Sequence, residues 1–353
     1  MRAKSLQFLK TLVEAPSPSG YEQPAARVFR DYVGAFADEV STDVMGSVHA
    51  LVRGTGSGPS VMLAGHIDEV GFMVTYITDD GFLSFKPIGG HDPQILPGAR
   101  VQVHTADGPI LGVMGRLPVH LLDEEERKKV VKTDRMFVDV GTPAKEVKKG
   151  VHVGDPITYA VGLEEFGSGM AVSRAFDDKM GAWVVAEVLR EVKSRSKVGS
   201  DVVGVATVQE EIGVRGGTTS AYSVDPVVGI AVDVGHATDY PDVNKRKHGA
   251  NALGAGPIIT RGANINPRVF ELLVGAAKAE KIPYQTDGHP RGTGTDANAI
   301  QLARGGKAAG LVSVPLRYMH TPTEVLALKD LENTVKLLVA FLKRLKPGTD
   351  FTP

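Results

Sequence analysis

Four apolar runs rich in β-branched residues constrain the fold of this chain more than any other feature. They lie at residues 61–65, 201–208, 227–234 and 308–316, each followed by polar or turn-forming residues. Short runs that do not alternate with polar residues are typical of strands buried on both faces, as in parallel sheets covered by helices. The pattern predicts an α/β fold: a mixed, largely parallel sheet flanked by helices.

Helical signals lie around and between these runs. Residues 4–14 predict a first helix, and a second, capped by Ser19 or Gly20, runs to about Phe36. Apolar residues at helical spacing follow Asp177-Asp178, and Asn266-Pro267 opens a helix to about Lys281. Two further helices are predicted: one capped by Asp296 and closed by Gly305, and one from Asp330 to Leu345. Residues 47–53 and 60–65 read as neighbouring strands.

The segment 70–163 has a different texture. Short stretches alternate apolar and polar residues, and Asp80-Gly81 and Asp107-Gly108 signal tight turns. Its one helical piece is DEEERKKVV, beginning at residue 123. We therefore expect a β-rich, barrel-like domain at 70–163, inserted between two parts, 1–69 and 164–353, of the α/β domain.

Composition excludes several classes of protein. The formal net charge of −1 provides no field that would recruit nucleic acid or an anionic membrane. No apolar run approaches the ~20 residues of a membrane span, and the first residues lack a signal-peptide pattern, so we expect a cytoplasmic protein. The chain has no cysteine, so a metal site must use His, Asp and Glu.

Polar clusters follow the predicted strands. His66 and Asp68 follow the first run, and Glu210-Glu211 follow the second. Asp233 lies near the end of the third run with His236 beyond it, and His320 follows the fourth. The pair Asp177-Asp178 precedes a helix, whose amino end stabilises carboxylates. Since ligands gather at the carboxyl ends of parallel strands, these side chains are expected to converge.

Such a set suits two divalent cations joined by one carboxylate. The chain supplies one candidate for each role: His66 and Asp233 for one cation, Glu211 and His320 for the other, and Asp177 between them. Nitrogen and oxygen ligands without thiolate indicate zinc or cobalt, with manganese possible. Asp68 is expected to orient His66. Glu210 stays free as a general base that takes a proton from a metal-bridging water and returns it to a leaving amine.

Five motifs resemble, in order and context, those of the M42 family of metallo-aminopeptidases. They are AGHIDEVGF, RAFDDKMG, VQEEIGVRGG, AVDVGHATD and RYMHTPTE, and the resemblance covers essentially the whole chain. It implies the binuclear zinc-peptidase fold, removal of N-terminal residues from short peptides, and the ligand and base roles given above. It also implies a cis Asp177–Asp178 bond, dimerisation through the insertion, and assembly of dimers into a tetrahedral dodecamer.

Two other functions remain open from the sequence. Members of the family have been described as endoglucanases, and Glu210 with Asp68 could form the acid pair of a glycan hydrolase. Against this, Trp183 is the only tryptophan available to stack on a sugar. The third hypothesis is a catalytically inactive assembly protein that keeps a metal for stability, against which the intact general base argues.

Substrate contacts are less well defined. Arg261 and Arg291 lie in glycine-rich stretches and could bind an acidic first residue by bidentate pairing, or make structural ion pairs instead. His120 could reach a neighbouring active site or serve a local structural role. Asp178 reads equally as a helix cap or as part of the site. The preferred N-terminal residue, the native metal and the extent of assembly stay open.

Overall fold

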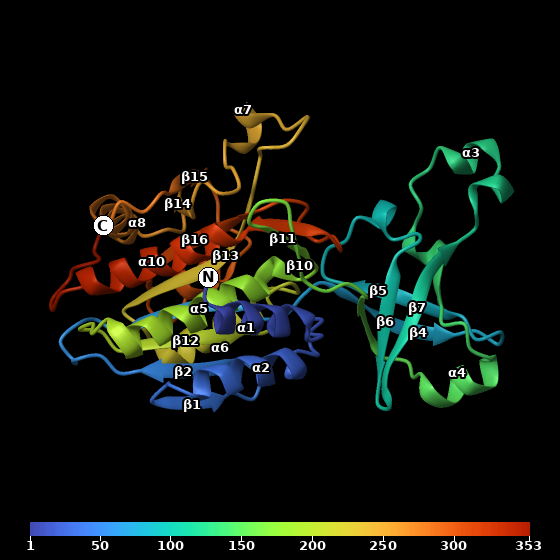
Figure 1. The fold of residues 1–353 in the computed structure, drawn as a ribbon, viewed down its shortest axis with the longest axis horizontal. Coiled ribbons are helices and arrows are strands. Elements are labelled where there is room, and N and C mark those ends of the chain that lie inside the picture. The colour runs from blue at the N-terminus through green and yellow to red at the C-terminus, as the bar shows by residue number, and fades with distance from the viewer.

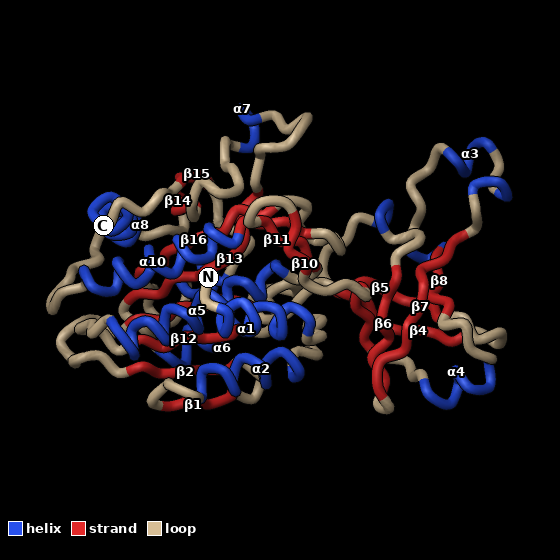
Figure 2. The backbone as a smooth tube through the Cα atoms, viewed as in Figure 1, coloured by secondary structure: helices blue, strands red, loops and turns tan.

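The computed structural model describes residues 1–353 and has two lobes, an α/β sandwich and a smaller β-barrel (Figure 1). Figure 2 shows the helices gathered around the sheet of the larger lobe and the strands dominating the smaller one. The helices of the larger lobe are α1 (Ala3–Glu14), α2 (Gln23–Gly34), α5 (Phe176–Arg195), α6 (Arg215–Val224), α7 (Lys245–His248), α8 (Pro267–Ala279), α9 (Asp296–Gln301) and α10 (Leu328–Arg344). None of the helices combines the length and apolar composition that crossing a bilayer requires.

The larger lobe is built on an eight-stranded mixed sheet. Its order is β1 (Glu39–Thr42), β2 (Val48–Val52), β12 (Val202–Thr207), β3 (Val61–His66), β13 (Val228–His236), β16 (Ala308–Leu316), β14 (Ile258–Gly262) and β15 (Gln285–His289). The central strands β12, β3, β13 and β16 are mutually parallel and are the four predicted runs. The chain passes from β3 to β12 on one side and then to β13 on the other, which makes β3 a topological switch point.

Both faces of the central strands are buried, as the apolar runs predict. On β3, Val61 and Leu63 join the core beneath α1, α2, α5, α8 and α10, whereas Met62 and Ala64 join the core beneath α6 and α9. Successive side chains on a strand point to opposite faces, so each run must be apolar throughout. This arrangement confirms the predicted fold class.

The expected pairing of residues 47–53 with 60–65 is wrong. β12 lies between these strands, antiparallel to β2 and parallel to β3. A short, turn-rich connection favours pairing of neighbouring strands, but a parallel partner from far along the chain occupies the edge of β3 here. The turn-rich segment 53–60 therefore crosses over β12.

The smaller lobe is a closed six-stranded barrel. Its strands are β4 (Gly71–Ile77), β5 (Leu83–Ile88), β8 (Met136–Asp139), β7 (Gly108–Arg116), β6 (Arg100–Thr105) and β9 (Pro156–Tyr159), in that order around the barrel. Fourteen buried apolar residues fill its interior. The segment holds α3 (Glu124–Arg127) and also α4 (Ala144–Gly150), so the expectation of a single helical piece is wrong. The seven-residue α4 is too short to give a clear 3.6-residue period.

A buried ion cluster joins the two lobes. The Glu69 carboxylate, just before β4, pairs with Arg174, the residue after β11 (Met170–Ser173). Strand β11 lies between β10 (Glu164–Phe166) and β17 (Glu324–Ala327) in a small three-stranded sheet. Lys179 Nζ of α5 lies 2.8 Å from Glu69 Oε1. Burial opposes ionisation, but the charges of Arg174 and Lys179 lower the pKa of Glu69 to about 2. The segments that enter and leave the barrel are therefore joined by ion pairs near the start of α5.

Three predicted helix caps are wrong, because each side chain bonds to a distant part of the chain. Ser19 Oγ donates to Asp68, and α2 begins only after Glu22. Asp296 is the first residue of α9 and accepts a hydrogen bond from Thr207 Oγ1. Asp330 lies in the first turn of α10 and accepts from the amides of Gly254 and Gly256. The predicted cap Asn266 does bond the first amides of α8.

Candidate metal centre

The polar clusters predicted to converge meet at the carboxyl ends of the parallel strands. His66 ends β3, Asp233 lies near the end of β13, and Glu210 and Glu211 follow β12. His320 lies four residues beyond the end of β16. His66 is the last residue of the central strand of the switch point, so the other elements surround it.

Asp177 lies between the two histidines. Its Oδ1 is 3.2 Å from His66 Nε2 and its Oδ2 is 3.3 Å from His320 Nε2. Glu211 Oε1 is also 3.2 Å from His320 Nε2. One carboxylate thus presents a separate oxygen to each imidazole, the arrangement required of a group that bridges two cations.

Two overlapping groups of ligand atoms could each hold an ion. His66, Asp178 and Asp233 form one, His66, Asp177 and Glu211 form the other, and within each the ligand atoms lie within 4.8 Å of one another. The five side chains predicted as ligands are therefore together, with His320 joined through its contacts to Asp177 and Glu211. Asp178 is an addition to the predicted set.

Two glycines allow α5 to lie close against β3. A Cβ on Gly65 would lie 2.4 Å from the carbonyl carbon of Gly181, and one on Gly181 would lie 2.3 Å from Asp178 Oδ2. A side chain at Gly65 would push α5 away from β3, and one at Gly181 would displace the Asp178 carboxylate. These glycines therefore bring the paired aspartates within reach of His66.

Asp178 serves the backbone as well as the cluster. Its carboxylate accepts hydrogen bonds from the amides of His66 and Gly181, both at 3.1 Å. The bond to Gly181, in the first turn of α5, is the capping contact that the sequence suggested as one alternative. The bond to His66 ties the end of β3 to the same helix. The Asp177–Asp178 peptide bond is cis, as the family resemblance implies.

Asp68 organises the site from behind. Its Oδ1 lies 3.4 Å from His66 Nδ1, and its two oxygens accept from the amides of Glu210 and Glu211 at 3.0 and 3.1 Å. Ser19 Oγ donates to it at 2.7 Å. Burial opposes ionisation, but these bonds lower the pKa of Asp68. One anionic side chain thus fixes both the ring of His66 and the turn that holds the two glutamates.

Glu324 is a site residue that the sequence reasoning missed. Its buried carboxylate accepts from the amide of His320 at 2.9 Å and from that of Asp177 at 3.1 Å. It therefore fixes the backbone of two metal-site residues from different elements. It falls inside the quoted motif RYMHTPTE, but no sequence signal marks a carboxylate as an acceptor for main-chain amides.

The cluster holds more buried acid than nearby positive charge. Burial raises the pKa of Glu210 to about 9, against the opposing charge of His66 and with that of Asp233 adding to the rise. The pKa of Asp233 is raised well above its usual value, again mainly by burial. Burial lowers the pKa of His320, but the hydrogen bonds and charges of Asp177 and Glu211 outweigh this effect and raise it to about 11.

A cation fits this donor set. Buried carboxylates are expensive unless a positive charge compensates them, and divalent cations provide it. The imidazole and carboxylate donors match zinc, cobalt or manganese. Since ligating histidines must be neutral, binding would release the protons that the site otherwise holds.

The centre opens into a cleft of about 340 Å³. None of the 20 residues lining the cleft is a lysine or an arginine. Arg261 and Arg291 are exposed and do not line it, and the Arg261 guanidinium lies 5.8 Å from the ring centre of Phe270. His120 is exposed on the barrel lobe, in the short turn Val119–Leu121.

The protein is an α/β sandwich with an inserted barrel, and a centre rich in acids and histidines lies at its switch point. These features together place it in the class of metal-dependent hydrolases. The chain belongs to the M42 peptidase family, because the family described as M42 glutamyl aminopeptidase matches residues 46–337. It is therefore a metal-dependent aminopeptidase, and the predictions of family and enzyme class are confirmed.

Relatives agree over the full length. Lysyl aminopeptidase of Pyrococcus furiosus is 37% identical over 351 residues, covering 98% of this chain and 99% of the relative. The TET aminopeptidase of the marine sediment archaeon Thaumarchaeota archaeon SCGC AB-539-E09 has a TM-score of 0.92 at 37% identity, covering 97% of both chains. Pyrococcus horikoshii TET1 peptidase has a TM-score of 0.84 at 28% identity, covering 97% of this chain and 100% of its own, and it can assemble into a tetrahedron or a large octahedral shell.

Proposed function

We propose that this aminopeptidase works at a binuclear centre held by His66, Asp177, Glu211, Asp233 and His320. The observation that supports this most directly is the placement of Asp177, with one oxygen at 3.2 Å from His66 and the other at 3.3 Å from His320. A single-ion site would need no carboxylate shared between two imidazoles. Zinc or cobalt suits the donors best, and manganese is the third candidate.

Bound divalent cations would polarise the scissile carbonyl and make a coordinated water acidic. Glu210 then acts as the proton carrier, with its Oε2 3.8 Å from His66 Nε2 at the edge of the cluster. It takes a proton from the attacking water at its carboxylate and returns it to the leaving amine. Asp68 positions both partners, because it contacts the ring of His66 and the amide of Glu210.

The carboxylates at the cleft also explain why only chain ends would be cut. A free α-ammonium group carries a positive charge that an internal peptide nitrogen lacks. Glu210, Glu211 and Asp233 face the cleft from the centre itself, and their negative charge favours such a group next to the reacting bond. Short peptides with a free amino end are therefore the proposed substrates.

Assembly into a homo-oligomer is part of the proposal. The proposed domains are a catalytic domain of residues 1–69 and 164–353, and a dimerisation domain of residues 70–163. The barrel lobe exposes Leu117, Val119, Leu121 and Val130 on one projecting segment around α3, as a surface awaiting a partner would. The tetrahedral assembly of Pyrococcus horikoshii TET1 peptidase supports a dodecamer built from dimers. His120 lies on that segment and is the candidate to reach a neighbouring site, and a light-scattering mass tests the assembly.

The decisive experiment replaces Glu210 by Gln. The variant keeps shape and the surrounding ligands but cannot carry a proton, so kcat on aminoacyl-nitroanilides should fall by about 10²-fold or more with metal content retained. Elemental analysis measures the metal. Glu191→Gln, an identical change in another cavity, is the control and should retain full activity. Wild-type turnover in Glu210→Gln would exclude this glutamate as the proton carrier.

The same assays separate the two other functions. A glycan hydrolase would release reducing ends from a soluble glucan and ignore the nitroanilides. An inactive assembly protein would cleave neither, yet its melting temperature would fall on chelation. Nitroanilide hydrolysis that chelator abolishes excludes both alternatives.

A further inference from the structure

The far wall of the cleft has a chemistry that the proposed reaction does not use. Beyond the metal-centre residues, the lining consists of apolar, hydroxyl and glycine residues, two histidines, and one carboxylate, Asp287. No lysine or arginine is present to pair with an acidic side chain. The cleft is therefore built to receive positive charge at a point away from the reacting bond.

Asp287 lies on the same face of the sheet as the metal-centre residue Asp233. Asp233 is paired in register with Ser313 of β16, and Ser313 with Ile258 of β14. Thr260, two residues beyond Ile258 and on the same side of β14, is paired with Asp287 of β15. All five residues line the cleft. The line crosses three strand spacings, roughly 14 Å at about 4.8 Å each, and shifts by two residues along β14, roughly 6.6 Å at about 3.3 Å each.

The Asp287 carboxylate has no fixed cationic partner. Its Oδ1 accepts from the amide of Gly288 at 2.7 Å, and its Oδ2 lies 3.2 Å from His289 Nε2. The side chain is 28% exposed, so it is half-withdrawn from water but open to the cleft. Histidine, unlike lysine and arginine, carries no permanent positive charge, so no fixed cation of the protein compensates this carboxylate.

We infer that Asp287 determines specificity and that the preferred substrates begin with lysine or arginine. This inference rests on the proposed aminopeptidase function. The α-amine would lie at the metal centre, and the side chain of the first residue would run along the strand face toward Asp287. The long stem of lysine or arginine suits this path, since it packs on apolar surface while its charged end reaches a carboxylate.

The walls support this orientation. Ile258 and Leu311 are buried and line the cleft, and they provide apolar surface for the methylene stem. Thr260 and Ser313 add only small hydroxyl groups. An acidic first residue would place a second negative charge beside Asp287 with no cation to compensate it, so glutamyl and aspartyl substrates are disfavoured. This reverses the acidic specificity suggested by Arg261 and Arg291.

The test measures kcat/KM for the nitroanilides of lysine, leucine and glutamate on the metal-loaded enzyme. The wild-type order should be lysine, then leucine, then glutamate. Asp287→Asn should lower the lysine-to-leucine ratio about tenfold or more, as expected for loss of a charge-assisted hydrogen bond. Asp287→Arg should raise the glutamate-to-leucine ratio. Each ratio comes from one preparation, so it does not depend on the folded fraction.

The matched control is Asp225→Asn, which removes one carboxylate from an exposed pair with Lys307 outside the cleft. It should leave both ratios unchanged. The inference is overturned if the wild type prefers leucine or glutamate, or if Asp287→Asn leaves the lysine-to-leucine ratio unchanged. If no aminoacyl-nitroanilide is cleaved with any of the three metals, the proposed function itself fails, whereas cleavage with the wrong preference rejects only the specificity.

Discussion

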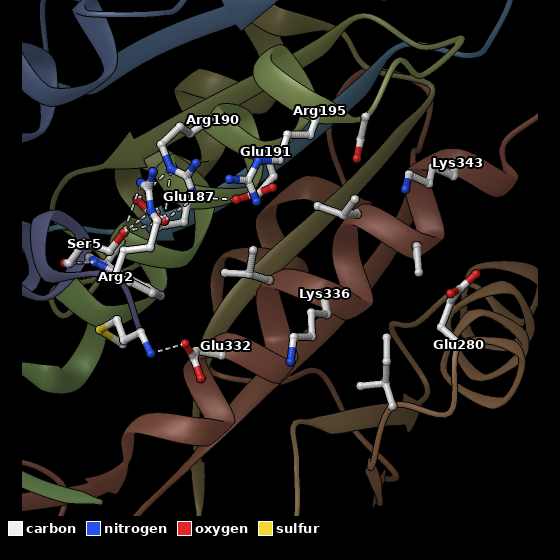
Figure 3. Close-up of a pocket in the computed structure, with 17 residues that line it drawn as sticks. Arg2, Ser5, Glu187, Arg190, Glu191, Arg195, Glu280, Glu332, Lys336 and Lys343 are labelled. Carbon is white, nitrogen blue, oxygen red and sulfur yellow. Dashed lines mark hydrogen bonds and ion pairs between the residues drawn. The ribbon is translucent and has the colours of Figure 1, made fainter.

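Two cavities of this molecule are each lined by several carboxylates, and they differ in whether arginines of the protein compensate the negative charge. One is the cleft at the metal centre. The other, of about 470 Å³, lies between α1, α5, α8 and α10, where arginines face the carboxylates (Figure 3). Helix α5 connects them, because Asp177 lies in its first turn and Glu187 ten residues later, about 15 Å along the axis.

In the second cavity the buried carboxylate, that of Glu187, has cationic partners. Arg190 Nη2 lies 2.8 Å from Glu187 Oε2, Arg2 Nη2 lies 3.7 Å from the same oxygen, and Tyr32 also bonds this side chain. The terminal amine of Met1 pairs with Glu332 (Figure 3). Burial opposes ionisation of Glu187, but these partners outweigh it and lower its pKa.

The difference separates a structural carboxylate, Glu187, from Glu210, the carboxylate proposed as the proton carrier. Burial alone does not distinguish Glu187 from Glu210, since both are largely inaccessible. The two residues differ in their partners. Arg190 compensates the charge of Glu187, whereas burial and neighbouring acids raise the pKa of Glu210 to about 9. A group left without its counter-charge indicates that the cation comes from solution.

The largest expected effect is at the metal centre, where no arginine or lysine compensates the carboxylates. Asp233→Asn removes a proposed metal ligand, so metal binding and turnover should fall by at least about 10²-fold, beyond the loss of an outer partner alone. The metal-free variant should be at least as stable as the metal-free wild type, because burial and neighbouring acids raise the pKa of Asp233 well above its usual value. Calorimetric metal titration and urea unfolding with chelator measure the two. A marked loss of stability without metal would mean that the acids are already compensated.

In the second cavity, where Arg190 pairs with Glu187, a substitution should lower stability and leave activity unchanged. Glu187→Gln leaves the partly buried Arg190 without its main partner, and breaking a buried pair costs up to about 3 kcal/mol of unfolding free energy. Arg190 retains Glu191, which limits the loss. Activity per folded molecule should not change. Urea unfolding and active-site-normalised kcat measure this, and a large loss of kcat with intact stability would contradict the division between the two cavities.

A smaller effect is expected for the positioning residue between the ligands. In Glu324→Gln the amide nitrogen cannot accept from a backbone amide, so one of the bonds to His320 and Asp177 is lost. Metal affinity should fall about 10–100-fold, as for other partners that orient ligands. Glu332→Gln is the control and should leave affinity unchanged. Equal affinities of Glu324→Gln and wild type would reduce Glu324 to a structural role.

Prediction from sequence succeeded where one local pattern determines the structure. Both faces of the central strands are buried, so β3, β12, β13 and β16 are visible as apolar runs. The residues after them meet because parallel strands share an edge. Strand order was not accessible in the same way, since β12 enters between β2 and β3 from about 140 residues further along the chain.

The parts of the site that sequence reasoning missed are main-chain contacts. Glu324 acts by accepting hydrogen bonds from two amides, and Gly65 and Gly181 act by leaving out a side chain. None of these contributes a ligand atom, so no metal-ligand pattern includes it. The same reason explains the caps, because Asp296 and Asp330 looked like local caps but bond to segments distant in sequence.

The smallest expected effect is a change with pH in how much Glu187 stabilises the second cavity. The pKa of Glu187 in the folded protein lies below its usual 4.5, so this side chain stabilises the fold fully above about pH 4.5 and progressively less as pH falls through its folded value. Gln at this position does not titrate. The difference in unfolding free energy between wild type and Glu187→Gln should therefore stay constant from pH 8 to about pH 5 and shrink below pH 4.5. Urea titrations with chelator at each pH measure it, and a difference that persists unchanged to pH 3 would show that packing, rather than its charge, is what Glu187 contributes.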